Sequence, residues 1–167
     1  MSNFISFKDE DIFCSNGLMD VLLTAIGLSG SGLAVDEDEK NLIVWLMQRD
    51  QNRVGRGTVG FDITELPWKK EKFAQQRTFL LQVLDGARSK TCWETLDYEP
   101  NEEIVFDRID KLIKMVSKIT VEDIDEENTK EWLREDEDGS CVPKGYPKCP
   151  EHGILLSIFG CLACNDR

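Results

Sequence analysis

The chain has 167 residues, of which 41% are hydrophobic, so it can build one ordinary hydrophobic core and leaves little chain for a second full domain. Its 32 acidic and 20 basic side chains give a net charge of −12 at pH 7. This charge repels phosphate backbones, so we expect no nucleic-acid partner, whereas a basic protein would be a suitable one.

The chain is expected to be cytoplasmic, with no membrane partner. Its first ten residues lack the basic flank and apolar stretch of a signal peptide, and no apolar run reaches membrane-spanning length. In the cytoplasm the six cysteines are expected to be reduced or metal-bound rather than joined in disulfides. Cys14 and Cys92 lie in apolar surroundings far from the other four, which predicts that they are small core residues.

Two helices are predicted in the first third of the chain. Ser15 or Asn16 can cap a buried helix that begins near Gly17, and the glycines at 27, 30 and 32 are predicted to end it. Asp36 followed by Glu39 resembles a capping box, and the four acidic residues 36–39 suit the positive end of a helix dipole. This cap predicts that the apolar run 42–47 is helical rather than a buried strand.

Three further helices are predicted downstream. Pro67 is placed as the first residue of a helix that weakens or ends at Asp85-Gly86. Residues 101–119 carry apolar side chains on one arc and charged ones on the opposite arc, which is typical of an amphipathic helix. A strongly acidic helix is expected over residues 121–134, anchored by Ile124, Trp132 and Leu133. The best strand candidate is the short segment 58–63.

The C-terminal residues contain a cysteine–histidine pattern that composition does not explain. Cys149 and His152 form one short-spaced pair, and Cys161 and Cys164 form another, in the order C-x2-H-x8-C-x2-C. Two residues between the members of each pair let both side chains of a tight turn reach one ion, and three thiolates with one imidazole suit tetrahedral Zn²⁺. Four protein ligands leave no open position, so this zinc would be structural. Cys141 is the main competitor for a ligand place.

The fold class expected from these elements is mainly α, with at most a minor β element. Residues 1–138 would form a single helical domain, and residues 139–167 a small zinc-binding tail after the acidic linker 136–140.

The acidic charge is densest between residues 122 and 138. Glu122, Asp123, Glu126 and Glu127 are the leading candidates for partner binding, since few cations lie near them in the sequence. The alternative is a solvated, solubilising face.

Residues 55–60 match G-x-G-x-x-G, but no helix begins directly after them, so nucleotide binding is not expected. A flexible turn, on which Arg53 and Arg56 could make contacts, is the preferred interpretation. The only histidine belongs to the metal pattern, and no nucleophile or metalloprotease motif occurs. We therefore expect a non-enzymatic protein, although a carboxylate-based site would remain invisible among 32 acidic residues.

Residues 56–68, RGTVGFDITELPW, together with residues 93–101, WETLDYEPN, resemble small cytoplasmic immunity proteins of bacterial polymorphic-toxin and contact-dependent inhibition systems. The resemblance implies a non-enzymatic protein that binds one cognate toxin domain, often a nuclease, and blocks its active site. The negative charge agrees independently with a basic nuclease as partner. The alternative is a zinc-containing adaptor or regulator whose tail binds another protein or nucleic acid.

Overall fold

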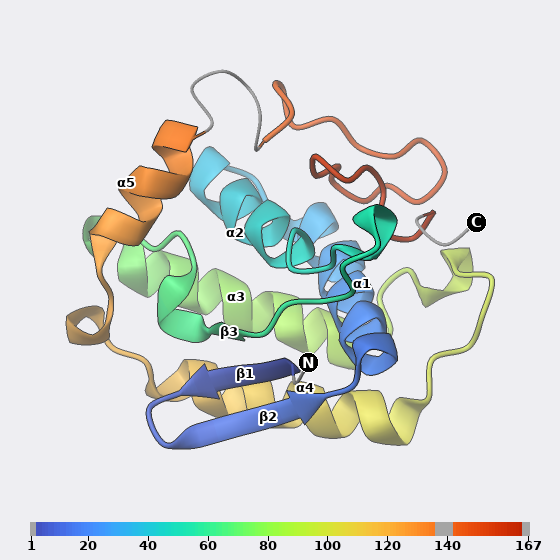
Figure 1. The fold of residues 1–167 in the computed structure, drawn as a ribbon, viewed down its shortest axis with the longest axis horizontal. Helices are drawn as coiled ribbons and strands as arrows, with labels where there is room; N and C mark the ends of the chain where they lie inside the picture. Colours follow the sequence, from blue (N-terminus) through green and yellow to red (C-terminus); the bar gives the residue numbers. More distant parts are fainter. Residues whose placement is uncertain (1–2, 136–141, 165–167) are drawn as a thin grey trace.

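The computed structural model describes residues 3–135 and 142–164. Five α-helices and one small sheet form this part of the chain (Figure 1), so the mainly α prediction is confirmed. No described helix is both long and apolar enough to cross a bilayer. The bounds of the elements are β1 Asn3–Phe7, β2 Glu10–Cys14, α1 Asn16–Leu33, α2 Glu37–Met47, β3 Phe61–Asp62, α3 Phe73–Arg88, α4 Glu102–Lys118 and α5 Glu126–Glu135.

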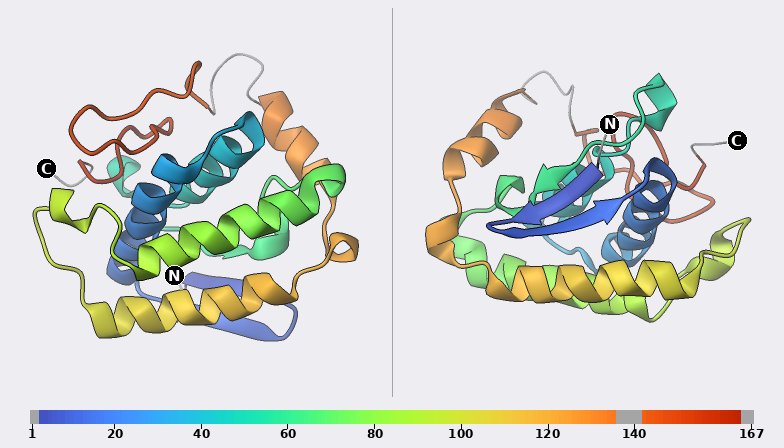
Figure 2. Two further views of the ribbon diagram at one scale, coloured as in Figure 1. Left: turned by 180° about the vertical axis from the view of Figure 1, so that it is seen from behind. Right: turned by 60° about the horizontal axis from the view of Figure 1, so that its bottom comes forward.

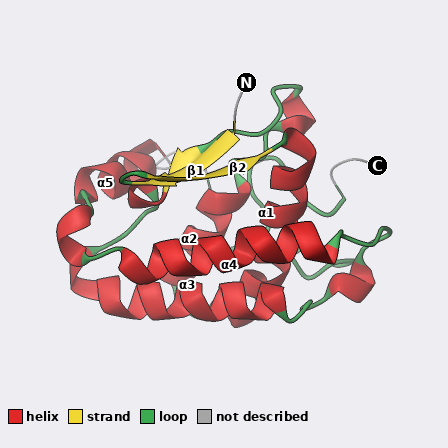
Figure 3. Ribbon diagram, turned by 90° about the horizontal axis from the view of Figure 1, so that it is seen from below, coloured by secondary structure: helices red, strands yellow, loops and turns green. Residues whose placement is uncertain are grey.

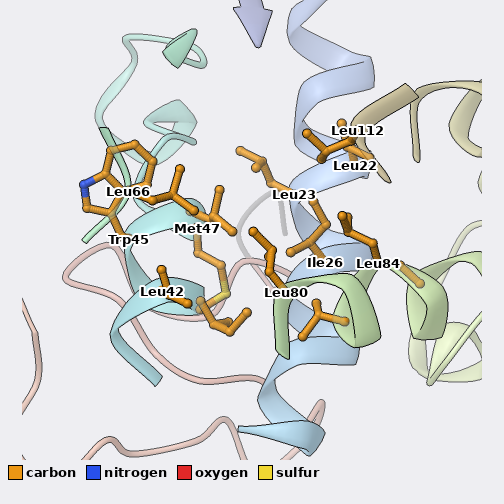
Figure 4. Packing of buried hydrophobic residues seen from close by; sticks show 14 of the residues in the cluster. Leu22, Leu23, Ile26, Leu42, Trp45, Met47, Leu66, Leu80, Leu84 and Leu112 are labelled. Atoms are coloured by element: carbon orange, nitrogen blue, oxygen red, sulfur yellow. The ribbon is translucent and has the colours of Figure 1, made fainter. Parts of the chain in front are cut away.

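The helices pack around α1, which contacts α2, α3 and α4. Helices α3 and α4 lie side by side (Figure 2), and the β1–β2 hairpin lies along α4 (Figure 3). The core between them is continuous and contains aliphatic side chains from four helices (Figure 4). Its members in the close view include Leu22, Leu23, Ile26, Trp45, Met47, Leu80, Leu84 and Leu112.

The N-terminal hairpin was not predicted from the sequence. Strand β1 pairs antiparallel with β2 and parallel with β3, in the order β2-β1-β3. Alternate residues Ile5, Phe7, Ile12 and Cys14 are buried, so one face of the hairpin belongs to the core. Lys8 takes a φ of 54° in the tight turn between the strands. The alternation was present in the sequence, but a Lys-Asp turn gives a weaker hairpin signal than Asn-Gly.

The predicted strand 58–63 is shorter than expected. Only Phe61–Asp62 forms a strand, while Thr58 makes an isolated bridge with Asp50. Residue 60 passes directly against β1, since a Cβ at Gly60 would lie 2.7 Å from the backbone N and O of Phe4. The segment therefore follows β1 closely with little room for side chains.

Helix α1 continues through the three glycines that were predicted to end it, so that prediction was wrong. A Cβ at Gly30 would lie 2.3 Å from Cδ1 of Ile43, and one at Gly27 would lie 2.7 Å from Sδ of Met47. Both partners belong to α2. These glycines are therefore retained for close helix packing, and tertiary contacts outweigh their low helix propensity.

The cap of α2 is confirmed. The side chain of Asp36 accepts a hydrogen bond from the backbone N–H of Glu39 at 2.8 Å, and the Glu39 carboxylate accepts one from the backbone N–H of Asp36 at 3.3 Å. The apolar residues 42–47 follow as helix and are buried, as predicted.

Asp38 joins the first turn of α2 to the segment before α3. Its carboxylate pairs with Lys69 at 2.8 Å and with Lys72 at 2.9 Å. Desolvation raises the pKa of this carboxyl, but the hydrogen bonds from the two lysines outweigh it and hold the pKa below its ordinary value of 3.8. The ionised form is therefore stabilised by folding.

Asp38→Asn is expected to lower the free energy of unfolding at pH 7 by about 1 kcal/mol, because both lysines are partly exposed and solvent screens the pairs. The depressed pKa makes this contribution complete above pH 3.8, and it disappears as the pH falls through the lower folded value. Urea unfolding of the parent and the variant measures this difference in stability. It is done at about pH 7, where the carboxyl is ionised, and at about pH 2.5, where an ordinary aspartate is mostly protonated. Asp110→Asn, at an exposed pair with Arg88, is the control and should change stability by less than about 0.5 kcal/mol. An unchanged difference at both pH values would contradict the linkage.

The predicted start of the third helix at Pro67 was wrong, since α3 begins at Phe73 after a short 3-10 turn. The buried Gln76 side chain explains the shift. Its Oε1 accepts the backbone N–H of Lys69 at 2.8 Å, and its Nε2 donates to the carbonyl of Pro67 at 3.3 Å. These bonds hold residues 67–69 in a non-helical conformation, in which the backbone N–H of Trp68 donates to the carbonyl of Leu66 at 2.7 Å. Helix α3 also runs past Asp85-Gly86 to Arg88, because Gly86 lies against Ser29 of α1.

The last two helices agree in part with the predictions. Helix α4 is capped by Asn101 and buries the apolar side of its predicted arc, except for Ile104, which is exposed. The acidic segment is not one helix. A 3-10 turn over Val121–Asp123 and helix α5 are separated at Ile124, whose burial breaks the continuity. Trp132 is buried, and its indole N–H donates to Oε1 of Gln48 at 3.2 Å.

Candidate metal centre

The four predicted ligands lie together. Cys149, His152, Cys161 and Cys164 each offer one ligand atom, and these atoms all lie within 4.8 Å of one another. The five cysteines in the described part of the chain are all free thiols. The cluster could therefore hold a metal ion.

The distances between the ligand atoms suit a tetrahedral ion. Zinc–sulfur bonds of about 2.3 Å and zinc–nitrogen bonds of about 2.0 Å at tetrahedral angles place two sulfurs roughly 3.8 Å apart and a sulfur and a nitrogen roughly 3.6 Å apart. The Sγ atoms of Cys149 and Cys164 are 3.8 Å apart. Nδ1 of His152 lies 3.6 Å from Sγ of Cys149, 3.6 Å from Sγ of Cys161 and 3.2 Å from Sγ of Cys164. Nδ1 is therefore the imidazole atom that would bind the ion.

A tight turn positions the first ligand pair. The backbone N–H of Gly153 donates to the carbonyl of Cys149, and the backbone N–H of Cys149 donates to the carbonyl of Ile154, both at 2.8 Å. Gly153 adopts a φ of 70°, which a side chain would disfavour. Two isolated bridges, Lys148 with Leu155 and Ser157 with Gly160, bring the second pair back to the first.

Burial and crowding set the electrostatics of the thiols. Desolvation raises the pKa of Cys149, but the backbone N–H and ring of His152 outweigh it and lower that pKa to about 6. Desolvation raises the pKa of Cys161 to about 12, and it also raises the pKa of Cys164, where Cys149 adds to the effect. Three negative sulfurs in so small a volume repel one another, so a cation is needed to hold all three as thiolates.

The C-terminal tail that carries the cysteine–histidine cluster is attached to the helices by buried contacts. Ile154 and Leu155 are fully buried, and Cδ1 of Ile154 would lie 2.8 Å from a Cβ at Gly27. The backbone N–H of Leu155 donates to Oγ of Ser31 in α1 at 2.8 Å. The Tyr146 hydroxyl donates to Oδ1 of Asn41 in α2 at 2.8 Å. Sequence reasoning missed these attachment residues, because no local sequence pattern shows that a glycine or a serine will contact a segment far along the chain.

The competing ligand Cys141 and the predicted boundary between residues 138 and 139 lie outside the described residues, as does the linker 136–140. The division into two domains therefore stays a prediction. Of the two predicted core cysteines, Cys14 is fully buried, whereas Cys92 is half-buried with a φ of 63°.

The four acidic candidates lie on the 3-10 turn and the first turn of α5. Asp123 pairs with Lys8 at 3.4 Å and caps its own turn, and Glu127 pairs with Lys130 at 3.5 Å. Glu122 and Glu126 form no ion pair with a described residue. Two of the four charges are thus locally compensated, whereas the exposed Glu122 and the half-buried Glu126 have no cation beside them among the described residues.

The glycine-rich segment 55–60 leads into β3 and not into a helix, as expected. Gly55 and Gly57 have positive φ, which fits a turn. Arg56 is exposed, and Arg49 nearby in the sequence stacks its guanidinium 4.1 Å from the ring centroid of Trp45.

Searches against family models, curated proteins and solved structures found no match for this chain.

Proposed function

We propose that the chain is a non-enzymatic immunity protein that binds and neutralises a cognate toxin domain, a basic nuclease, through its acidic surface. The observation that carries the proposal is the set of carboxylates at residues 122–127, in which Glu122 and Glu127 are exposed, Asp123 and Glu126 are half-buried, and Glu122 and Glu126 have no cationic partner among the described residues. Complementary potentials of this kind accelerate and orient protein association. The resemblance of residues 56–68 and 93–101 to immunity proteins supports the same class.

In this proposal the metal is a structural Zn²⁺ held by Cys149, His152, Cys161 and Cys164. Three sulfur ligands and one imidazole favour zinc over the harder cations Mg²⁺ and Ca²⁺, which prefer oxygen. The ion would shape the tail and take no part in any reaction.

Replacing Glu122, Asp123, Glu126 and Glu127 with lysine is expected to slow association with the toxin domain at least about tenfold and to weaken protection of cells that express it. The test uses a toxin domain encoded next to the gene of this chain as the partner. Stopped-flow association between low salt and 0.15 M salt, where screening shortens to about 8 Å, should show a steep fall for the parent protein.

A second quadruple variant keeps the same net charge and serves as control. It carries lysine at the exposed acids Asp11, Glu71, Asp85 and Glu103, which lie on other elements. It should associate much faster than the first variant. If both variants associate at the parent rate and protect fully, the acidic face is only a solubilising surface.

A zinc-containing adaptor is the second candidate, and one observation favours it. Ile158 lies in the turn between the bridge residues Ser157 and Gly160 of the tail, and its side chain is 49% exposed. In an adaptor, this apolar side chain on the turn of the tail would be the contact with another protein. Ile158→Ser would abolish partner binding in this case and leave it unchanged in the first.

A further inference from the structure

A surface pocket of about 390 Å³ lies on the connection between α3 and α4, which projects from the side of the molecule (Figure 1). Trp93 and Tyr98 supply aromatic walls. The remaining lining is mostly charged and comprises Lys90, Glu94, Glu99, Pro100 and Glu102. The pocket is separate from the residues assigned above to the metal or to the acidic face.

The backbone around the pocket is held in an unusual conformation. Lys90 and Cys92 both have a φ of 63°, a region that non-glycine residues rarely adopt. Side-chain hydrogen bonds brace the turn, since Thr91 donates to the carbonyl of Gly86 at 2.8 Å and Thr95 donates to that of Cys92 at 2.7 Å. Such strain persists only where the surroundings enforce it, and it often marks a binding site.

Trp93 is fixed by a stack of side chains. Its ring packs on Phe106 of α4, with centroids 5.7 Å apart and an interplanar angle of 31°. The guanidinium of Arg88 lies 4.0 Å from the Phe106 centroid. The indole is therefore a rigid wall, and its neighbour already holds a guanidinium by the same kind of contact.

More negative than positive side chains line the pocket, so it favours a cation. Three carboxylates face one ammonium, and Lys90 pairs with Glu102. Glu94 and Glu99 form no ion pair within the described chain. Carboxylates beside aromatic faces are the environment that binds organic cations best.

The indole N–H of Trp93 lies away from solvent. Its Nε1 is buried and has no hydrogen-bond partner among the described residues. A ligand in the surface pocket can therefore contact the ring of Trp93 but not its N–H. The contact expected from Trp93 is stacking on its ring, which favours a planar cation.

We propose that this pocket binds an arginine side chain of the basic partner, with the guanidinium between Trp93 and Tyr98 and against Glu94 and Glu99. A planar guanidinium stacks on aromatic rings and donates several hydrogen bonds in one plane, which an ammonium does not. The choice of a basic protein as the source of this arginine rests on the proposed function. The preference of the pocket for a guanidinium rests only on the side chains that line it.

The first test uses a defined probe. The peptide acetyl-Gly-Arg-Gly-amide is titrated into ¹⁵N-labelled protein, with the Trp93 indole signal assigned through Trp93→Phe. We expect this signal to shift, and the double variant Glu94→Gln/Glu99→Gln to weaken binding about tenfold. The matched control Glu126→Gln/Glu127→Gln should bind as the parent does. The citrulline peptide, which has the same shape without charge, should not bind.

Three results of the peptide titration would overturn the assignment: no shift of the Trp93 indole, equal binding of the citrulline peptide, or equal binding of spermidine. The second test measures the toxin domain against the same variants. If the toxin domain fails to bind the parent while the arginine peptide shifts Trp93, the proposed function fails and the pocket stands. If the toxin domain binds the parent and the Glu94→Gln/Glu99→Gln variant equally, the pocket is not the partner's site and the proposed function stands.

Discussion

Removal of the metal is expected to lower the melting temperature and loosen the tail, while most of the helical circular dichroism survives. The tail places Ile154 and Leu155, both fully buried, against α1. Losing both from the core removes about 3–6 kcal/mol at roughly 1.5–3 kcal/mol for each apolar side chain. Most of the buried cluster comes from the helices and the hairpin, so we expect the helices to fold without the ion. Chelator titration followed by circular dichroism and calorimetry measures both effects.

Metal analysis of protein purified without added zinc identifies the ion and its ligands. We expect one zinc per chain in the parent, and loss of that zinc in Cys161→Ser. Cys92→Ser is the matched control, since that thiol lies outside the cluster, and it should keep the metal. Cys141→Ser tests the competing ligand and should also keep it. A stoichiometry well below one in the parent, or full loss of helicity on mild chelation, would contradict these expectations.

Gly30→Val is expected to destabilise the protein by about 3 kcal/mol or more, since overpacking a closely packed core forces strain on both helices. A Cβ at this position would lie 2.3 Å from Cδ1 and 2.7 Å from Cγ1 of Ile43, which is itself fully buried. The Ile43 side chain would therefore have to move within the core to make room for the new side chain. Chemical denaturation of the purified variant gives the change in unfolding free energy.

The same substitution two residues along α1 provides the control. A Cβ at Gly32 meets no atom within 4 Å, so Gly32→Val should change stability by less than about 0.5 kcal/mol. Ile43→Ala removes the clashing atoms, so Gly30→Val/Ile43→Ala should be more stable than the sum of the two single changes predicts. If the two changes in unfolding free energy simply add, the new side chain at position 30 and Ile43 do not compete for the same space.

Features that depend on neighbours in the chain were predictable from the sequence. The capping box of Asp36 and Glu39 and the amphipathic period of α4 arise from contacts within one or two turns. The candidate metal ligands belong to the same class, because only two residues separate the members of each pair within one turn. Only the contact between the two pairs is longer in range, and the short loop that connects the pairs leaves few other arrangements for them.

Features that depend on distant partners were not predictable. The helix predicted from Pro67 starts at Phe73 because the buried Gln76 binds the preceding backbone. The acidic helix is interrupted because Ile124 enters the core. In both segments the local propensity for helix was weaker than a contact that no sequence window contains.

The sequence by itself determined a mainly α fold, the capped and amphipathic helices and the gathering of four candidate metal ligands, because each follows from residues within a few turns of one another. The tertiary structure alone decided that α1 runs through Gly27 and Gly30, since these positions must admit Met47, Ile154 and Ile43 from other segments. It also decided that the C-terminal tail contacts α1 through Ser31 and that Trp93 and Tyr98 line a surface pocket together with Glu94 and Glu99. Close packing and unpaired polar groups are properties of surfaces brought together by folding, and they leave no periodic trace in the chain.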